Sequence, residues 1–485
     1  MSEAPKLEAD VAIVGAGGAG LYAALTAAAE GARVVLVSAT PLARTASYWA
    51  QGGIAAALAP GDSPDLHRHD TEVAGRALVR PSAAAVLCRE APRIVADLQR
   101  LGVRFDLDPE GELALGLEGG HSRRRVVHAG GSATGRRIVR HLSALVAESP
   151  RIAVLEQARA ATIWRRDGRC VGLVCEDGRA IAARGVVLAT GGAAALWSRT
   201  TNPPGSVGIG ALLALAAGAA IADLELVQFH PTAVTGIEGR EGFLVTEAIR
   251  GEGAMLLDHE GERFVEELAP RDEVARAITD KMRASGKPHM WLDMRAVDPG
   301  HFPNVVSALQ DAGLDPMAEL VPVAPAAHYV MGGVVTDLDG ATTRPGLYAV
   351  GEAACTGLHG ANRLASNSLT ECFVFGQRAA LAALTEPALT AGAGEPPQPD
   401  AIPAPSRATR EHLWRDAGLL RDAEGLRTLL DDPHPLARIV AGCALLRTES
   451  RGGHQRSDFP RTDPELDGRH AVVRGDDAPV FESWV

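Results

Sequence analysis

Lysine is almost absent from this 485-residue sequence, because Lys6, Lys281 and Lys287 are the only three and arginine supplies the other basic residues. Chemistry that depends on a lysine Schiff base therefore has few candidate residues. The six cysteines form no CxxC pair and follow no regular spacing. This usage predicts reduced, mostly buried thiols in a cytoplasmic protein rather than a disulfide framework.

A positive net charge and a membrane-spanning run are also absent. The formal net charge is -12, which gives no electrostatic reason to expect nucleic acid or an anionic membrane as a partner. The longest uncharged stretch, 200–222, is rich in Ala and Gly, and its apolar part falls short of the about 20 residues that span a bilayer. We expect there a helix packed closely on a sheet. The first six residues lack the basic and apolar regions of a leader, so we expect none.

A glycine-rich segment near the N-terminus has the form of a dinucleotide-binding fingerprint. The apolar run 9–14 ends at Gly15-Ala-Gly-Gly-Ala-Gly20, an Ala/Leu-rich segment follows to about residue 30, and a second apolar run spans 33–37. This order predicts a strand, a tight turn, a helix and a second strand, with the helix N-terminus facing phosphate groups. A glycine-rich turn without a ligand is the alternative, and the complete strand–helix–strand context favours dinucleotide binding. The second strand ends in Ser38 where an acidic residue would bind the ribose, which predicts a weaker contact.

Two further segments favour FAD over a nicotinamide cofactor. Ser47-Tyr-Trp-Ala-Gln-Gly-Gly53 is a turn of small residues that suits close approach to a planar ring system. Ser366-Asn-Ser-Leu369 opens a predicted helix, whose N-terminus would stabilise an anionic reduced flavin. The same residues can serve as an ordinary helix cap, and the two roles are compatible.

Strands from distant parts of the chain are predicted to join one sheet. Segments 185–192 and 346–352 have the pattern of buried strands that end in Gly-Gly and Gly-Glu, and they accompany the strand at 9–14. The length allows about two to four domains. The predicted fold class is therefore α/β: an FAD-binding doubly wound (Rossmann-like) domain with an inserted α+β capping domain and a short C-terminal helical domain.

The expected boundaries follow from composition. The FAD-binding domain takes 1–223 and 330–392, the capping domain 224–329, a Gly/Pro/Ala-rich linker 393–405, and the C-terminal helical domain with its tail 406–485. Helical periodicity ends near residue 446, so we expect the polar tail 447–485 to be irregular and to lie back against the body. The sequence has no internal repeats.

Seven motifs follow one another along the chain: Ala50-Gln-Gly-Gly53, Glu118-Gly-Gly-His-Ser-Arg-Arg-Arg125, Gln228-Phe-His-Pro-Thr232, Thr246-Glu-Ala-Ile-Arg-Gly-Glu-Gly253, Ala269-Pro-Arg-Asp272, Pro325-Ala-Ala-His328 and Gly357-Leu-His-Gly-Ala-Asn-Arg-Leu-Ala-Ser-Asn-Ser368. Together they resemble the succinate dehydrogenase/fumarate reductase flavoprotein superfamily, and within it most the L-aspartate oxidases. The resemblance runs from about residue 8 to Glu449-Ser-Arg-Gly-Gly-His454.

Two positions discriminate within that superfamily. Respiratory succinate dehydrogenases carry a histidine that bonds covalently to the flavin, and Ala46 stands at the corresponding position here, which implies non-covalent FAD. The resemblance also implies that Glu118 faces the ammonium group of aspartate, because a carboxylate opposite a plain dicarboxylate would repel it. The alternative for Glu118 is a solvated loop charge.

The resemblance assigns the remaining substrate contacts and the proton path. Arg363 with His328 would hold one carboxylate, and His230 with Thr246 the other; a core histidine and a loop histidine are the alternatives. Arg271 would transfer a proton, and since arginine is a poor base, it would need neighbours to take the proton up. Glu247 and Arg250 would extend that path, and a structural salt bridge is the alternative for Arg250. The catalytic candidates are Arg271, Glu118, Glu247 and Arg250.

The FAD contacts implied by the motifs are Gly15, Ala16, Gly17, Gly18, Ala19, Gly20, Ser38, Ser47, Ala50, Gln51, Gly52, Gly53, Ala158, Gly191, Glu352, Ser368 and Leu369. No metal is expected. Relatives carry an aspartate in a Gly-Asp-Gly segment where this chain has Ile209, which together with Ser38 predicts weaker FAD retention. The C-terminal region is also short for the superfamily, so we expect a reduced helical bundle.

The activity implied by the resemblance is oxidation of L-aspartate to iminoaspartate, with hydride transfer from C2 to flavin N5. Electrons would pass to O2, giving H2O2, or to fumarate, giving succinate. The product would feed quinolinate synthesis, so this would be the first step of de novo NAD biosynthesis, with quinolinate synthase as a functional partner. The alternatives are a soluble fumarate reductase or succinate dehydrogenase-like flavoprotein, and a non-catalytic flavoprotein that senses or scaffolds.

Overall fold

The computed structural model describes residues 6–389 and 392–484. Expectations that fall on 1–5, 390–391 and 485 lie outside the described residues; they include the absence of a leader and the outermost ends of the predicted domains and linker.

The main sheet has seven strands in the order β6-β2-β1-β9-β8-β7, with β16 also pairing to β9. Their bounds are β1 Lys6–Val14, β2 Val34–Val37, β6 Ile152–Leu155, β7 Ala160–Arg166, β8 Arg169–Cys175, β9 Ala180–Leu188 and β16 Leu347–Ala349. β8 pairs with the first part of β9 and β16 with its last part. The prediction that strands near residues 10 and 348 belong to one sheet is therefore confirmed.

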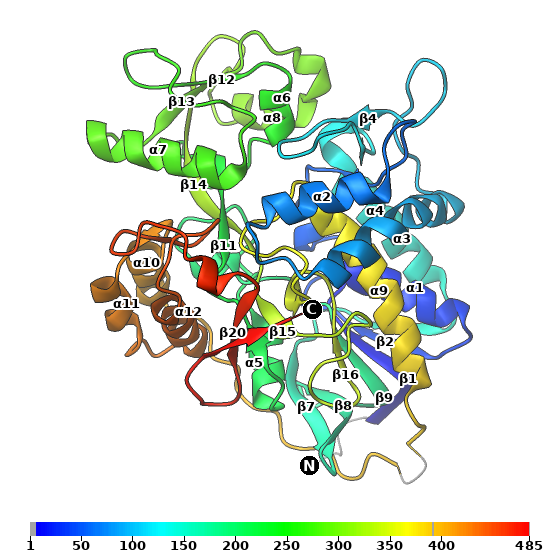
Figure 1. Ribbon diagram of the computed structural model, residues 1–485. Coiled ribbons are helices and arrows are strands. Elements are labelled where there is room, and N and C mark those ends of the chain that lie inside the picture. Colours follow the sequence, from blue (N-terminus) through cyan, green and yellow to red (C-terminus); the bar gives the residue numbers. More distant parts are fainter. Residues whose placement is uncertain (1–5, 390–391, 485) are drawn as a thin grey trace.

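Both faces of this sheet are covered. Along β1, Val11 and Ile13 face a core built with α1 Gly18–Ala29, α3 Pro81–Arg100, α4 Thr134–Glu148 and α9 Asn367–Thr385. Ala12 and Val14 alternate to the opposite core, which contains α5 Ile209–Ala216 and the C-terminal helices. This arrangement, visible in Figure 1, confirms the predicted α/β fold class.

The glycines of the fingerprint are required by close backbone approach. Gly15 has φ +109°, and a Cβ there would lie 2.2 Å from the Ala189 carbonyl oxygen. A Cβ on Gly20 would lie 1.9 Å from the Gly15 carbonyl oxygen, where α1 meets β1. The turn thus brings the helix N-terminus directly to the end of the strand, as the spacing predicts.

The capping unit is an α+β layer at the top of Figure 1 with a hydrophobic core of its own. Its sheet has the order β11-β14-β13-β12. The strands are β11 Val227–Val234, β12 Met255–Leu257, β13 Met290–Asp293 and β14 Val321–Val330, and the helices are α6 Glu247–Gly251, α7 Arg271–Ser285 and α8 Pro303–Gln310. β11 and β14 extend from the body into this unit, so residues on them can lie at the junction.

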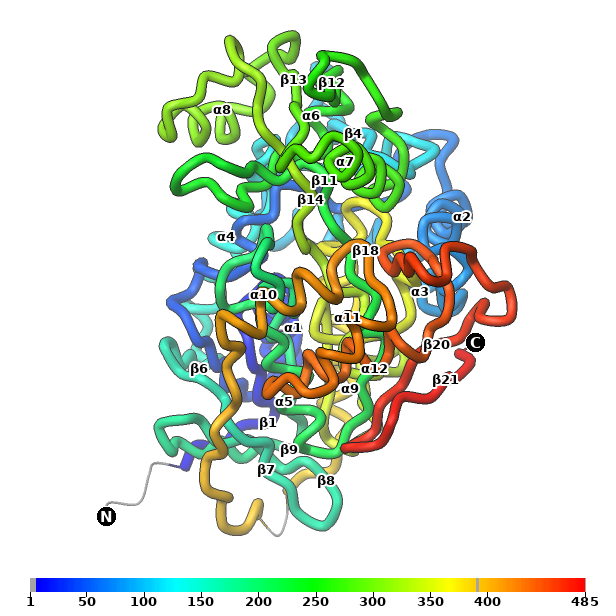
Figure 2. The backbone as a smooth tube through the Cα atoms, turned by 90° about the vertical axis from the view of Figure 1, so that its left-hand side faces the viewer, coloured from blue at the N-terminus to red at the C-terminus, as the bar shows by residue number. Residues whose placement is uncertain are grey.

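The C-terminal region has three helices, α10 Arg407–Asp416, α11 Ala423–Leu429 and α12 Pro435–Leu446, which Figure 2 shows in orange beside α5. The expectation of an irregular tail is wrong. β20 Arg469–Val473 and β21 Val480–Ser483 extend a second sheet, β17-β15-β10-β20-β21, in which β20 pairs with β10 Ile221–Ala222 and β21 pairs with β20. The tail is thus a structural part of the body.

The remaining elements among the described residues are six short 3-10 helices, of which Ala46–Trp49 overlaps the turn at 47–53, together with α2 Pro64–Ala74, β3 Ile54–Ala55, β4 Leu115–Gly116, β5 Val126–Val127, β15 Gly333–Val335, β17 Ala354–Cys355, β18 Leu420–Arg421 and β19 Gln455–Arg456. The cysteines are free, and all except the half-buried Cys372 are buried, which confirms the expected thiols. Among the described residues, no helix has the length and apolar character needed to cross a membrane.

A buried ion-pair network holds the tail in place. Arg447 Nε donates to Glu225 Oε1 at 2.8 Å, its Nη1 lies 3.3 Å from Glu449 Oε1, and all three side chains are fully buried. Burial raises the pKa of Glu225, with Arg447 opposing that rise. Glu449 is also held by Arg451, whereas Arg447 is the ion-pair partner shown for Glu225, so the buried Glu225 carboxylate depends on this one guanidinium.

We predict that Arg447→Gln lowers the free energy of unfolding by about 3–5 kcal/mol, since it leaves the buried Glu225 carboxylate without its counter-charge. The measurement is urea unfolding of the purified protein. Arg407→Gln is the matched control, because Arg407 is 92% exposed in its pair with Glu411 and its loss should cost less than about 1 kcal/mol. Equal losses in the two variants would contradict the assigned role of the network.

Candidate active site

Most of the predicted substrate residues meet where the capping unit joins the body. His230 lies on β11 and His328 on the adjacent β14, with ring centroids 5.1 Å apart. Burial lowers the pKa of both imidazoles well below the ordinary value, and Arg271 adds to the effect, so both rings are neutral at pH 7. Neutral rings can each donate one hydrogen bond to an anionic ligand.

The orientation of His328 depends on a residue that sequence reasoning missed. Thr201 Oγ1 lies 2.7 Å from His328 Nδ1, which leaves Nε2 as the ring nitrogen available to a ligand. Thr201 stands in the uncharged stretch before α5, far from His328 in the sequence, and nothing in its local context marks it.

Gln228 is the second missed residue, and it brings two predicted arginines together. Arg271 Nη1 and Arg363 Nη2 donate to Gln228 Oε1 at 3.1 and 3.0 Å. The Gln228 amide nitrogen donates to the Asn362 side chain and to the Arg363 carbonyl, both at 2.8 Å. Its place two residues before His230 on a strand is the signal that could have assigned it to the site.

Glu247 lies against Arg271 and Arg250, as the predicted proton path requires. Arg271 Nε donates to Glu247 Oε2 at 2.6 Å, and the Gly119 N–H donates to Oε1 at 2.8 Å. Burial alone would raise the pKa of Glu247, but Arg271 and Arg250 outweigh it and hold the pKa at about 2. Glu247 is therefore a permanent carboxylate that anchors Arg271.

Arg250 is incompletely satisfied in its buried position. Its Nη1 donates to the Glu267 carbonyl, its Nη2 is 3.8 Å from Glu247 Oε2, and its Nε and Nη2 have no hydrogen-bond partner among the described residues. Burial lowers the pKa of its guanidinium. A purely structural salt bridge would use these donors more fully.

Glu118 is buried, at 4% exposure, so the alternative of a solvated loop charge is excluded. The Ser366 hydroxyl donates to Glu118 Oε2 at 2.6 Å and accepts the Gly53 N–H at 3.0 Å. Glu118 thus lies between the turn at 50–53 and the N-terminus of α9. Burial, and after it the charge of Arg271, lowers the pKa of Arg363 to about 10. The charge of Glu118 partly opposes this lowering.

The residues around α1 fit a dinucleotide with a ring system. Gly17 caps α1 without a side-chain hydrogen bond, and the Gly18 N–H reaches Ser47 Oγ at 3.1 Å. Open space surrounds the Cβ position of Gly191, and the Gln51 Oε1 atom is buried without a partner among the described residues. A helix N-terminus without a side-chain cap, an open glycine and a buried polar atom without a partner are the features expected of a cradle for a bound group.

The other predicted cofactor residues border the same region. Ala50, Gly52 and Gly53 lie in the turn beside Ser366, and Ser368 and Leu369 lie in the first turn of α9, whose N-cap has no side-chain hydrogen bond. The Glu352 carboxyl accepts the Val330 N–H at 3.1 Å, and desolvation raises its pKa to about 7.

Ser38 and Ile209 are the two positions where the sequence departs from the expected cofactor contacts, and the structure shows what surrounds each of them. The Ser38 hydroxyl donates to the Thr40 carbonyl at 2.6 Å, so it can offer a ribose only an acceptor; the Ser38 carbonyl is taken by the Ala158 N–H. Ile209, the first residue of α5, packs against the hydrophobic core. That FAD retention is weakened remains a prediction.

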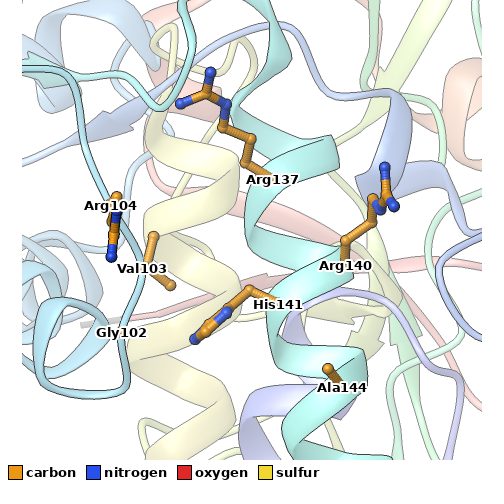
Figure 3. Close-up of a pocket in the computed structure, with 7 residues that line it drawn as sticks. All are labelled: Gly102, Val103, Arg104, Arg137, Arg140, His141 and Ala144. Atoms are coloured by element: carbon orange, nitrogen blue, oxygen red, sulfur yellow. The ribbon is translucent and has the colours of Figure 1, made fainter.

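A separate cavity of about 640 Å³ contains none of the predicted site residues. Figure 3 shows its lining, which comes from the loop after α3 and one face of α4. In Figure 3 the Arg140 side chain projects from α4 on the side away from Arg104. The junction of cap and body therefore remains the candidate active site.

The lowered pKa of Glu247 predicts a pH-dependent contribution to stability. A carboxyl with a folded-state pKa of about 2, against an ordinary 4.5, stabilises the fold fully above pH 4.5 and loses this effect as the pH falls toward 2. We predict that Glu247→Gln is less stable than the wild type at pH 7 and that the difference narrows between pH 5 and 3. Urea unfolding across this range measures it, with the exposed Glu110→Gln as control. A difference that stays constant with pH would contradict the assignment.

The comparisons with known proteins agree with this geometry. The family profile described as FAD binding domain matches residues 10–369, and that described as fumarate reductase flavoprotein C-term matches 430–482. The L-aspartate oxidase of Caulobacter vibrioides is 46% identical, covering 95% of this chain and 97% of the relative. That of Streptomyces coelicolor is 43% identical over 96% and 92%.

Solved structures are similar over the whole chain. A quinol-fumarate reductase with menaquinol molecules aligns with a TM-score of 0.89 and 29% identity, covering 99% of this chain and 98% of the other. The Mycobacterium smegmatis Sdh1 complex aligns with a TM-score of 0.84 and 30% identity, covering 99% and 95%. The predicted resemblance is confirmed: the chain belongs to the L-aspartate oxidases of the succinate dehydrogenase/fumarate reductase flavoprotein superfamily.

Proposed function

We propose that this protein oxidises L-aspartate to iminoaspartate with FAD, reducing O2 to H2O2 or fumarate to succinate. The observation that carries the proposal is the buried carboxylate of Glu118 beside a group of arginines. A ligand with two carboxylates and one ammonium group suits that combination, and L-aspartate is such a ligand.

Charge balance favours L-aspartate over succinate. Arg250, Arg271 and Arg363 contribute three positive charges, and Glu118 with Glu247 contributes two negative ones. The site thus has one positive charge in excess, and L-aspartate has one net negative charge at pH 7. Succinate would leave the buried site with an excess negative charge, which is costly in a medium of low dielectric.

The two carboxylates have separate partners in this proposal. Arg363, whose Nε is buried without a hydrogen-bond partner among the described residues, holds one carboxylate with His328. His230 and Thr246 hold the other; Thr246 is the N-cap of α6, and its side chain makes no capping hydrogen bond. A planar guanidinium and neutral imidazoles supply donors without adding further charge.

The proton chemistry follows from the same contacts. Glu118 accepts a hydrogen bond from the ammonium group and orients C2, and the ammonium group releases one proton to water as C2 gives up its hydride. FAD, when bound, would supply the hydride acceptor. Arg271, held at Nε by Glu247, exchanges a proton with the carbon skeleton when fumarate is reduced. Arg250 behind Glu247 compensates the charge that moves. The pKa of Glu247, about 2, keeps its carboxylate ionised at rest, so Glu247 holds Arg271 in place and passes the proton on toward Arg250 without storing it.

FAD is bound non-covalently in this proposal, because Ala46 offers no side-chain atom that could bond to it. Gly15 to Gly20 and Ser38 would meet the nucleotide, and 47–53, Ser368 and Leu369 the ring system. We assign 1–223 and 330–392 to the FAD-binding domain, 224–329 to the cap, 393–405 to a linker and 406–485 to the C-terminal domain.

The proposed product places the reaction in a pathway. An imine of this kind hydrolyses in water, so it must be consumed quickly, and its conversion to quinolinate makes this the first step of de novo NAD biosynthesis. We therefore infer a cytoplasmic enzyme that is functionally coupled to a quinolinate synthase. A soluble fumarate reductase is the second candidate, and the fold similarity to quinol-fumarate reductase favours it.

We predict that Glu118→Gln lowers kcat/KM for L-aspartate about 10- to 100-fold, through loss of a hydrogen bond to a charged group worth about 1.5–3 kcal/mol. Fumarate reduction by the reduced enzyme should not fall, since fumarate has no ammonium group and the change removes a like charge from its site. Steady-state rates with each substrate measure both. The exposed Glu112→Gln is the control, and it should change neither rate. Equal loss of both activities in Glu118→Gln would refute the ammonium role.

A further inference from the structure

Arg76, on the loop that follows α2, reaches across to the first turn of α7 in the cap. Its Nε and Nη2 each lie 3.1 Å from one of the two Asp272 carboxylate oxygens, and its Nη2 donates to Glu273 Oε1 at 2.6 Å. The Asp272 side chain is only 8% exposed. A two-point pair of this kind fixes orientation as well as distance.

The pair is continuous with the active site. Asp272 follows Arg271 directly, and its Oδ1 also accepts a hydrogen bond from Asn362 Nδ2 at 3.2 Å. Asn362 Oδ1 in turn accepts from Gln228, which holds Arg271 and Arg363. One connected set of hydrogen bonds therefore joins Arg76 to both arginines of the site.

The loop that carries Arg76 is held in an unfavourable conformation from its other side. Arg76 and Ala77 have φ values of 57° and 62°, in the left-handed region that non-glycine residues rarely adopt. Arg451 Nη1 donates to the Arg76 carbonyl at 2.7 Å, and the Gly468 N–H donates to the Ala77 carbonyl at 2.9 Å. The C-terminal tail thus imposes this backbone, and strain of this kind persists only where contacts enforce it.

The boundary between cap and body beside the Arg76–Asp272 pair is not filled by side chains. A cavity of about 530 Å³ lies there, lined by the Arg76 loop, by α7 and by the tail. Figures 1 and 2 show α2, α7 and the red tail segment approaching one another at this place. The contact between cap and body therefore rests here on a few polar pairs, a kind of interface that permits relative movement of the two parts.

We propose that Arg76 and Asp272 form a latch that fixes the first turn of α7 against the body and so positions Arg271 for proton transfer. Arg451 of the C-terminal tail holds the Arg76 backbone in the conformation that places its side chain against Asp272. Arg76 is a positioning residue, since it acts through Asp272 and touches neither substrate nor cofactor. The kinetic part of this inference rests on the proposed function.

A double-mutant cycle tests the latch in the FAD-loaded enzyme. Arg76→Gln and Asp272→Asn should each lower kcat for fumarate reduction about tenfold, with KM little changed, and the double variant should be no slower than the worse single one. Arg68→Gln is the matched control, because Arg68 lies on α2 and pairs within that helix with Glu72; its rates should match the wild type. Losses that multiply in the double variant would overturn the proposal.

Hydrogen exchange supplies a readout that does not depend on catalysis. Amides of the first turn of α7 should exchange faster in Arg76→Gln than in the wild type, while those of α1 and the flavin content stay unchanged. Unchanged exchange in α7 would overturn the latch. If the wild type failed to oxidise aspartate, the proposed function would fall, and the exchange experiment would still decide on the latch.

Discussion

The active site depends on holding two guanidinium groups, Arg271 and Arg363, against a single amide oxygen of Gln228. Like charges at this separation repel, and burial strengthens the repulsion, as the lowered pKa of Arg363 shows. The ionised Glu247 and the buried Glu118 offset this repulsion, and the two histidines add no charge because they are neutral. With the buried Arg250 also counted, three guanidinium groups face two carboxylates, and the one positive charge in excess defines the ligand that fits.

The fold brings these groups together from distant parts of the chain. β11 and β14 carry the histidines, α6 and α7 begin with Glu247 and Arg271, and the segment before α9 carries Arg363. Glu247 and Arg271 are the first residues of their helices in the cap, so small movements of the cap change their distances from the groups on the body. The embedded C-terminal tail, with its buried Arg447 and Arg451, restrains the loop that contacts the cap.

The sequence predicted the features that local spacing determines. The glycines at 15–20 require close backbone contacts within one strand–turn–helix unit, so their pattern alone indicates the turn and the fold class that follows from it. The gathering of His230, His328 and Arg363 came only from the resemblance, since their separation along the chain hides it. Gln228 was missed as a site residue because its amide bears no charge, although it accepts hydrogen bonds from both arginines.

The tail was misjudged for a physical reason. Arg447, Glu449 and His454 are polar, and polar residues ordinarily mark the surface. Here they are buried because Arg447 and Glu449 neutralise each other and His454 hydrogen-bonds to the Arg447 carbonyl. β20 pairs with β10, which lies more than two hundred residues earlier, and no local pattern reveals such a partner. Buried ion pairs and non-local strand pairing are both properties of the assembled molecule.

The central claim is that this site accepts an amino-dicarboxylate in preference to a plain one. The most direct test mixes the enzyme anaerobically with L-aspartate or with succinate at equal concentration. Reduction of the bound flavin is monitored by its absorbance. The account predicts that L-aspartate bleaches the flavin and that succinate does so at least about tenfold more slowly. Bleaching by succinate with no response to L-aspartate would contradict it.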